Sequence, residues 1–169
     1  MVSAGRTAAA GARSAASTRA GLVLLGVLAL DQATKHTIGT WIKPGQVRHV
    51  VPGLTLVYAR NTGVSFSFLA GDGALVYVVT IVAIIALVTY LMLRPDRRLL
   101  WLPTGMLVGG ALGNLIDRAA LGSVIDFIKL PHWPAFNFAD MSITFGVILL
   151  AVLIELNSRR EQTRERARP

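Results

Sequence analysis

The sequence of 169 residues has no cysteine, only 15% charged residues, and nine acidic residues against seventeen basic ones. The lack of cysteine excludes disulfides, thiolate nucleophiles and cysteine-based metal sites. The small charged fraction, 53% hydrophobic residues and a mean hydropathy of +0.57 are far from the composition of an ordinary soluble domain. The composition therefore predicts an integral membrane protein.

Several common catalytic motifs are also missing. The sequence has no phosphate-binding glycine loop, no Gly-x-Ser-x-Gly elbow and no His-Glu-x-x-His zinc motif. The three histidines, His36, His49 and His132, are not spaced as ligands of one metal ion. We therefore assign no metal and no cofactor.

The net charge of +8 comes mainly from basic residues in the two tails and in one short loop. Those residues are Arg6, Arg13, Arg19, Arg94, Arg97, Arg98, Arg159, Arg160, Arg164, Arg166 and Arg168. Basic residues are retained on the cytoplasmic side of a membrane, so this clustering fits membrane topology better than nucleic-acid binding. It predicts that both termini are cytoplasmic.

Four apolar segments are candidates for membrane helices, at about 21–41, 74–93, 99–118 and 140–156. The segment 74–93 has twenty uncharged residues, which as a helix would span about 30 Å. The first segment could instead be a secretory signal peptide, although no convincing cleavage site follows it. Residues 1–20 and 157–169 read as basic cytoplasmic tails, the first one disordered.

Two longer connections lie on the outer side, at 43–73 and 119–139. The first contains Val, Leu, Thr and Tyr around Pro52-Gly53, which predicts a pair of strands followed by a lid at 64–69. The expected fold is an all-α membrane protein with four transmembrane helices and a small extracytoplasmic β-rich cradle and lid between the first two helices.

Asp126 and Asp140 stand at the edges of segments that are otherwise apolar enough to be embedded in lipid. A charged side chain there costs at least about 2.5 to 3.5 kcal/mol, so a functional role is the first hypothesis. Two neighbouring carboxylates share one proton, and one can act as a base towards water while the other acts as an acid. The alternative is that Asp140 only caps the fourth helix.

Other polar residues allow both structural and functional interpretations. Asn114 and Asp117 lie one turn apart at the end of the third helix, where Arg118 could pair internally with Asp117 or help to position a polypeptide and the carboxylates. Gly109 and Gly113 form a small-residue face that favours close helix contact.

Asp31 and Lys35 are spaced to form an ion pair within the first helix. Asn61 either forms a turn or bonds an extended peptide.

Two non-peptidase functions remain open: a proton-coupled transporter with a relay through Asp31, Asp126 and Asp140, and a non-catalytic assembly factor.

Five motifs between residues 21 and 156 resemble those of the lipoprotein signal peptidases, also called signal peptidase II. They are Asp31-Gln32-Ala33-Thr34-Lys35, Asn61-Thr62-Gly63-Val64-Ser65-Phe66-Ser67, Gly109-Gly110-Ala111-Leu112-Gly113-Asn114-Leu115-Ile116-Asp117-Arg118, Val124-Ile125-Asp126-Phe127 and Phe136-Asn137-Phe138-Ala139-Asp140. This family is a bacterial group of four-helix membrane aspartic peptidases.

The resemblance implies that Asp126 and Asp140 are the catalytic dyad and that Asp117 is not catalytic. It implies cleavage of prolipoproteins before the diacylglyceryl-modified cysteine, in the bacterial inner membrane. The distribution of basic residues places both carboxylates towards the outer face, and we expect a monomer. Substrate-binding positions implied by the resemblance are Asn61, Asn114, Arg118 and Asn137. Polar positions tied to structural integrity are Asp31, Lys35 and Asp117. The partners implied are prolipoproteins and membrane lipids, without nucleic acid.

Overall fold

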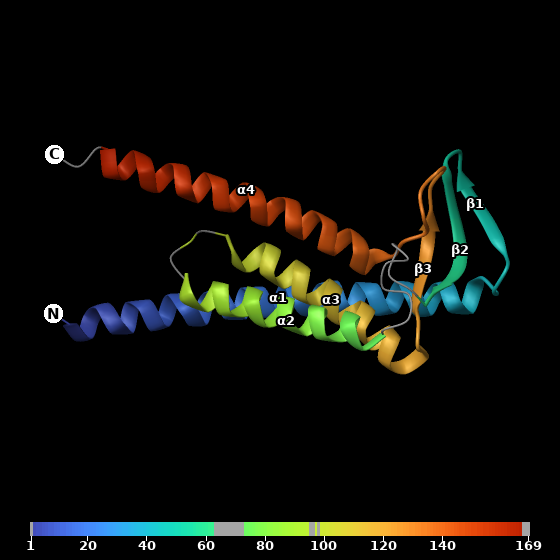
Figure 1. The fold of residues 1–169 in the computed structure, drawn as a ribbon, viewed down its shortest axis with the longest axis horizontal. Helices are drawn as coiled ribbons and strands as arrows, with labels where there is room; N and C mark the ends of the chain where they lie inside the picture. The colour runs from blue at the N-terminus through green and yellow to red at the C-terminus, as the bar shows by residue number, and fades with distance from the viewer. Residues whose placement is uncertain (1, 63–72, 95–96, 98, 167–169) are drawn as a thin grey trace.

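The computed structural model describes residues 2–62, 73–94, 97 and 99–166. The elements, in chain order, are α1 (Val2–Trp41), β1 (Val47–Val51), β2 (Leu54–Asn61), α2 (Gly73–Leu93), α3 (Trp101–Leu121), β3 (Val124–Lys129) and α4 (Phe138–Arg166). The helices follow the long axis of the molecule, the two termini lie at one end, and the sheet lies at the other end (Figure 1). The described chain is thus mostly helical, with a small sheet.

The first helix is longer than the sequence suggested. α1 begins at Val2, so residues 2–20, which were expected to form a disordered tail, are helical. This stretch is rich in alanine, the residue with the highest helix propensity, and it continues directly into the apolar segment. α4 likewise continues to Arg166, well into the predicted second tail.

Glycines on α3 allow the neighbouring helices to approach closely. A methyl group added at Gly105 would lie 2.6 Å from the Ala20 carbonyl oxygen, and one added at Gly109 would lie 2.9 Å from the Leu24 carbonyl oxygen. Both contacts are with α1, which confirms the predicted close helix contact at Gly109. A methyl group at Gly113 would collide with the carboxylate of Asp31, which is also on α1, so the close contact predicted at Gly113 is confirmed as well.

The sheet has three antiparallel strands in the order β1-β2-β3. The predicted strand pair is confirmed, and its turn contains Gly53 with a φ of 85°, a conformation that favours glycine. The third strand, β3, lies within 119–139, where we expected a loop. It pairs with β2 from Thr55 to Asn61, placing Asp126 opposite Ala59.

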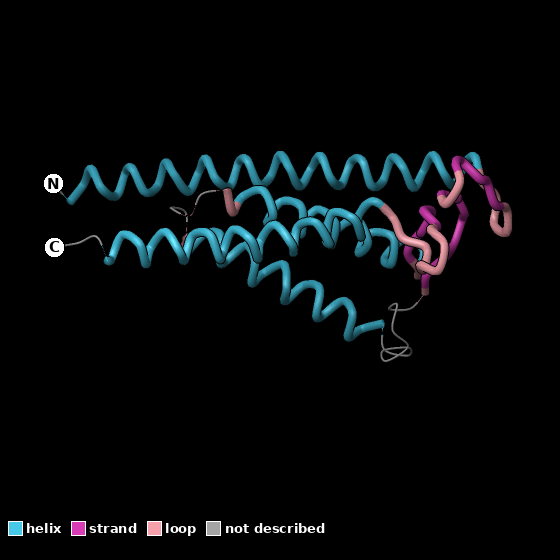
Figure 2. Tube along the Cα trace, turned by 90° about the horizontal axis from the view of Figure 1, so that it is seen from above, coloured by secondary structure: helices cyan, strands magenta, loops and turns pink. Residues whose placement is uncertain are grey.

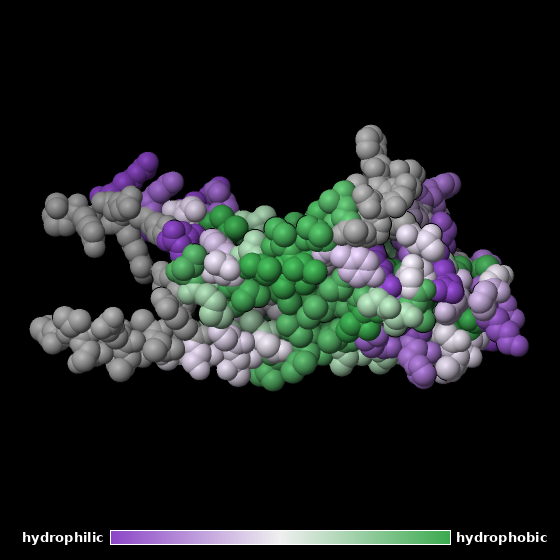
Figure 3. Space-filling view, turned by 60° about the horizontal axis from the view of Figure 1, so that its bottom comes forward, coloured by the Kyte–Doolittle hydropathy of each residue, from purple (hydrophilic) through white to green (hydrophobic). Residues whose placement is uncertain are grey.

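The helices expose a large apolar surface. Ser14–Trp41 and Phe138–Arg160 are long and apolar enough to cross a membrane, and Tyr77–Leu93 is a shorter apolar helix. Figure 3 shows hydrophobic residues spread over the middle of the molecule, with hydrophilic residues towards both ends. Such an extensive exposed apolar surface fits contact with lipid. These features agree with a membrane protein, while the predicted number of four spans stays a prediction.

α2 is the least integrated of the helices. Figure 2 shows it diverging from the other helices as it approaches the sheet end. Val78, Val82 and Ile85 on this helix are each more than half exposed. α2 thus leaves apolar side chains uncovered along much of its length.

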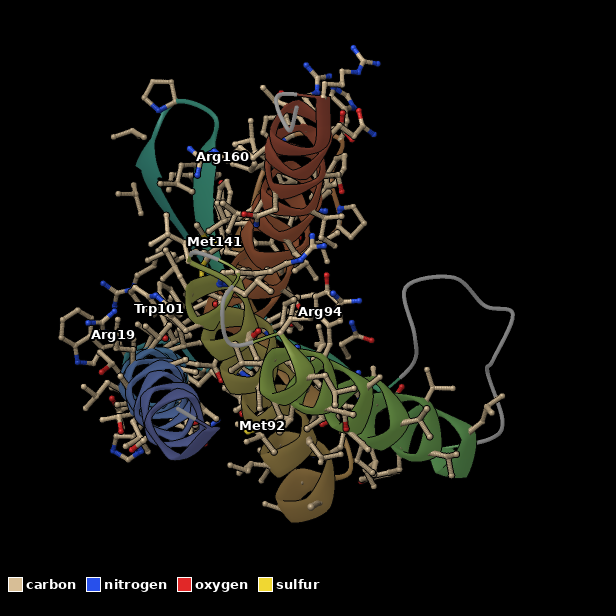
Figure 4. The ribbon with its side chains drawn as sticks, turned by 90° about the vertical axis from the view of Figure 1, so that its left-hand side faces the viewer. Arg19, Met92, Arg94, Trp101, Met141 and Arg160 are labelled. Carbon is tan, nitrogen blue, oxygen red and sulfur yellow. The ribbon has the colours of Figure 1, made fainter. Side chains whose placement is uncertain are left out.

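The end of the bundle near the termini has its own apolar core. Leu91, Leu100 and Leu153 are buried there together with Ala20. At the rim, the guanidinium of Arg19 lies over the ring of Trp101, 6.0 Å from its centroid, as Figure 4 shows from that end. α1, α2, α3 and α4 therefore meet here through apolar contacts.

Candidate active site

Asp126 lies on β3, with only 3% of its surface exposed. Its two carboxylate oxygens each accept a hydrogen bond from an amide side chain. Asn137 Nδ2 donates to Oδ1 at 2.8 Å, and Asn61 Nδ2 donates to Oδ2 at 3.0 Å. The pairing of β3 with β2 brings Asn61, the last residue of β2, to this carboxylate. The strand that the sequence did not reveal therefore builds one half of the site.

Asp140 lies in the first turn of α4. Its Oδ1 accepts a hydrogen bond from Asn114 Nδ2 at 2.8 Å, and its Oδ2 accepts one from the backbone N–H of Asn137 at 3.1 Å. In return, the Asp140 N–H donates to Asn137 Oδ1 at 2.9 Å. This reciprocal pair is a capping box, so Asp140 does cap its helix, as the alternative interpretation proposed. The cap also holds the carboxylate beside its neighbours in the site.

Asn137 joins the two carboxylates. It is completely buried and occupies the N-cap position of α4, directly before Phe138. Its side chain donates to Asp126, while its backbone N–H donates to Asp140. Asp126 and Asp140, which come from a strand and a helix, are thus held by one residue between them. The sequence predictions for Asn61, Asn114 and Asn137 all fall on donors to this pair.

The electrostatic environment of Asp126 favours its protonated form. Burial raises the pKa of Asp126 from the ordinary 3.8 to about 6, and the negative charge of Asp140 adds to that rise. The hydrogen bonds from Asn61 and Asn137 and the positive charge of Lys35 lower the pKa and so oppose it. A carboxyl with this pKa can gain and lose a proton near neutral pH, as acid–base catalysis requires.

A second polar cluster lies directly behind the carboxylates, centred on Lys35 of α1. Its ammonium lies 2.8 Å from Asp31 Oδ2 and 2.9 Å from Asp117 Oδ2, and it donates to Asn114 Oδ1 at 3.0 Å. The ion pair predicted between Asp31 and Lys35 is therefore confirmed. Asp117 also pairs with Lys35, rather than with its neighbour Arg118.

This cluster is tied to the backbone on both sides of the carboxylate pair. Asp31 Oδ1 accepts a hydrogen bond from the Ala139 N–H at 3.0 Å, at the start of α4. Asp117 Oδ2 accepts one from the Ile125 N–H at 3.1 Å, on β3 directly before Asp126. The cluster thus fixes the two chain segments that carry Asp126 and Asp140.

Arg118 and Gln32 also bond residues of these two polar clusters. Arg118 is half-buried and donates from Nη1 to the Asn114 carbonyl oxygen at 3.4 Å. Gln32 was not assigned a role from the sequence, although its position beside Asp31 was a usable signal. Its Nε2 donates to Asp31 Oδ2 and Asp117 Oδ1, both at 3.2 Å. The predicted lid at 64–69 lies outside the described residues.

The oxygens of this region are committed to protein donors. In the described part of the chain, no three His, Asp or Glu side chains are grouped so that they could hold a metal ion. What the arrangement offers is a pair of linked carboxyls with fixed amide donors. Such a pair can move protons between a bound water and a carbonyl group.

Comparisons with known proteins identify the family. Residues 23–156 match the family model described as signal peptidase (SPase) II. The lipoprotein signal peptidase of Moorella thermoacetica is 47% identical over 131 residues, covering 76% of this chain and 87% of the relative. That of Geobacter sulfurreducens is 45% identical over 148 residues, covering 82% and 92%.

Two solved structures are also similar. Both are described as bacterial membrane enzymes determined by the in meso method, one at 1.9 Å and one at 2.3 Å. The first has a TM-score of 0.71 and 35% identity, covering 80% of this chain and 91% of the other. The second has a TM-score of 0.74 and 32% identity, covering 89% and 93%. The chain belongs to the signal peptidase II family, a family of membrane peptidases.

Proposed function

We propose that this chain is an aspartic endopeptidase that removes signal peptides from diacylglyceryl-modified prolipoproteins, cutting directly before the lipidated cysteine. The observation that carries the proposal is the link through Asn137, which donates hydrogen bonds to both Asp126 and Asp140. Membership of the family supports the substrate class. The raised pKa of Asp126 supports a pair that shares one proton.

In the proposed reaction, the ionised carboxylate takes a proton from a water molecule as the water oxygen attacks the carbonyl carbon. The protonated carboxyl gives its proton to the carbonyl oxygen, which forms a neutral tetrahedral diol. In the second step, a diol hydroxyl returns its proton to one carboxylate while the other protonates the departing amine nitrogen. The C–N bond then breaks, and the pair again holds one proton.

The environments of the two carboxyls favour different starting roles. Burial raises the pKa of Asp126, which supports Asp126 as the proton holder in the resting pair. Asp140 instead lies in the first turn of α4, where the helix dipole favours a negatively charged group. We therefore assign the base to Asp140 and the acid to Asp126.

The proposed topology has four helices across the membrane, with both termini cytoplasmic and the sheet on the outer side. It is supported by the position of both termini at the end opposite the sheet (Figure 1). Three basic residues on α1, after α2 and on α4 add support, since basic side chains favour the cytoplasmic side; Figure 4 labels these residues, Arg19, Arg94 and Arg160, in a view from the end where the termini lie. In this arrangement the carboxylate pair faces the outer leaflet, where a lipidated cysteine would lie.

Substrate contacts are assigned to the polar groups around the pair. In this proposal, Asn61 and Arg118 bond the substrate backbone next to the cleaved bond, while Asn114 and Asn137 keep the carboxyls in place. α2, with its uncovered apolar side chains, offers a surface for the apolar signal segment or the diacylglyceryl chains. The enzyme would work as a monomer without a metal or organic cofactor.

A gel-shift cleavage assay on a purified diacylglyceryl prolipoprotein tests the proposal. The wild-type chain should release the signal peptide, with mass spectrometry locating the cut before the lipidated cysteine. Asp126→Asn and Asp140→Asn should each insert into the membrane and lose turnover by at least about a thousandfold. Retained cleavage by either variant would exclude the dyad, and no cleavage by wild-type protein would favour a non-catalytic role.

A further inference from the structure

We propose that Lys35 is a positioning residue for the reaction: it fixes which way the amide of Asn114 points, and through that amide it orients the donors on both catalytic carboxyls. This inference rests on the proposed function. The family resemblance implied that Lys35 and its partner Asp31 on α1 serve structural integrity. The proposal adds a role in the reaction.

The first step concerns Lys35 itself. An ammonium group can donate three hydrogen bonds and cannot accept any. Lys35 is 2% exposed and has three acceptors around it, Asp31 Oδ2, Asp117 Oδ2 and Asn114 Oδ1. The group facing it from Asn114 must therefore be the carbonyl oxygen. This leaves the NH2 of Asn114 to face Asp140, to which it donates at 2.8 Å.

The second step concerns Asn137. Asn114 Oδ1, held by Lys35, also accepts a hydrogen bond from Asn137 Nδ2 at 3.0 Å. The same nitrogen donates to Asp126 Oδ1 at 2.8 Å, while Asn137 Oδ1 is occupied by the N–H of Asp140. Rotating either amide by 180° would bring a donor against another donor. The amides of Asn114 and Asn137 are thus held in one arrangement that begins at Lys35.

The alternative is that Lys35 serves only to hold α1 and α3 together through the ion cluster. In that case, removing any part of the cluster would destabilise the fold and would affect catalysis only through the loss of folded enzyme. Gln32 separates the two roles, because it donates to Asp31 and Asp117 and to the Gly113 carbonyl oxygen. These contacts serve the cluster without reaching Asn114, which makes Gln32→Leu the matched control.

The experiment compares Lys35→Met with Gln32→Leu, using the full chain in detergent and a diacylglyceryl prolipoprotein as substrate. For folded enzyme, Lys35→Met should lower kcat by about 10- to 100-fold and leave KM within about twofold, since orientation of the reacting groups is lost. Gln32→Leu should lower the melting temperature and leave kcat within about twofold. Equal kcat values for Lys35→Met and wild type would overturn the proposal, as would an equal loss in both variants.

A double-mutant cycle tests whether the effect passes through Asn114. In an Asn114→Ala background, adding Lys35→Met should change kcat by less than about twofold, because the amide that Lys35 orients is already gone. Independent effects that multiply would contradict a shared path. Single-turnover conditions with excess enzyme keep the slow variants measurable.

Lys35→Met leaves two buried carboxylates without their cation, so a charge-balanced variant accompanies it. Lys35→Met combined with Asp31→Asn should fold and show the same loss in kcat. If neither variant folds, the cluster serves to hold the helices together and the positioning role is wrong. Failure of the wild-type enzyme to cleave would instead remove the proposed function, so the two failures are distinguishable.

Discussion

The two ends of the packed helices are built from different chemistry. Near the termini, the helices meet through Leu91, Leu100 and Leu153, which are apolar and buried. Under the sheet, α1 and α3 meet through Lys35 and its carboxylate partners, which are equally buried. The contacts between helices are therefore apolar at one end and ionic at the other.

The difference indicates that the two ends of the packed helices serve different purposes. Close packing at small residues is sufficient to hold membrane helices together, as the contacts at Gly105 and Gly109 show. A buried ion pair adds little net stability, because removing two charges from water offsets much of their attraction. The charges at the sheet end are therefore better explained by the carboxylate pair that they surround than by a need to join the helices.

The largest effect should come from Asn137→Ala, which removes the link between the two carboxyls. Turnover should fall by about a thousandfold, since donors to both proposed catalytic carboxyls are lost or displaced. Gel-shift cleavage with equal amounts of folded enzyme measures this. The matched control is Asn157→Ala on the same helix, where Asn157 donates only to the Leu153 carbonyl oxygen among the bonds described. A large loss of turnover in both variants would show that the effect is not specific to the carboxylate pair at the sheet end.

At the opposite end, Leu100→Ala should act on stability alone. Leu100 is fully buried, and its truncation should cost about 2 to 3 kcal/mol of folding free energy through lost packing. Cleavage per folded molecule should stay within about twofold of wild type. Thermal unfolding in detergent and cleavage at a temperature below the transition measure the two quantities. A selective loss of turnover would mean that this end also serves the chemistry.

A pair of glycine variants on one face of α3 should sharpen the comparison further. In Gly113→Ala, the new methyl group would press on the Asp31 carboxylate, so turnover should fall by about 10- to 100-fold. In Gly109→Ala, the methyl group would press on Leu24 and Val27 of α1, so stability should fall while turnover per folded molecule changes little. A loss of turnover in Gly109→Ala, together with a loss of stability alone in Gly113→Ala, would contradict the assignment of catalysis to the sheet end.

The smallest effect should be a shift in pH dependence for Asn61→Ala. The hydrogen bond from Asn61 lowers the pKa of Asp126, so its removal should raise that pKa above about 6. The proton on Asp126 would then be lost at higher pH, and the alkaline limb of the kcat profile should move upwards by up to about one unit. An unchanged or lowered limb would show that Asp126 is not the group titrating there.

The sequence predicted the parts of this molecule that depend on local pattern. The apolar segments, the hairpin turn at Gly53 and the ion pair between Asp31 and Lys35 all follow from spacing within one stretch of chain. β3 was missed because Val124–Lys129 is a short apolar run that periodicity cannot assign to a strand. Its strand character comes from pairing with β2, which is far away in the sequence.

The site was predictable in its residues but not in its connections. Residue type and edge position singled out Asp126 and Asp140, and the resemblance to a family added Asn137 and its neighbours. The sequence could not show that Asn137 is at once a helix cap and a donor to Asp126, since this depends on where β3 lies. The pairing of Lys35 with Asp117 likewise requires the contact between α1 and α3.

Asp126→Asn, assayed for cleavage and thermal stability on one preparation, shows whether the Asp126 carboxyl is needed for cleavage but not for folding. Because burial raises the folded-state pKa of Asp126, the contribution of its protonated form to stability is fully present below about pH 4 and is lost as the pH rises through about 6. A neutral amide avoids that loss. Its NH2 group would, however, face one of the two amide donors that bond Asp126, Asn61 or Asn137. The variant should therefore fold with a melting temperature close to that of wild type at pH 7 and have no measurable turnover of a lipidated prolipoprotein. Retained turnover in folded Asp126→Asn would contradict the account.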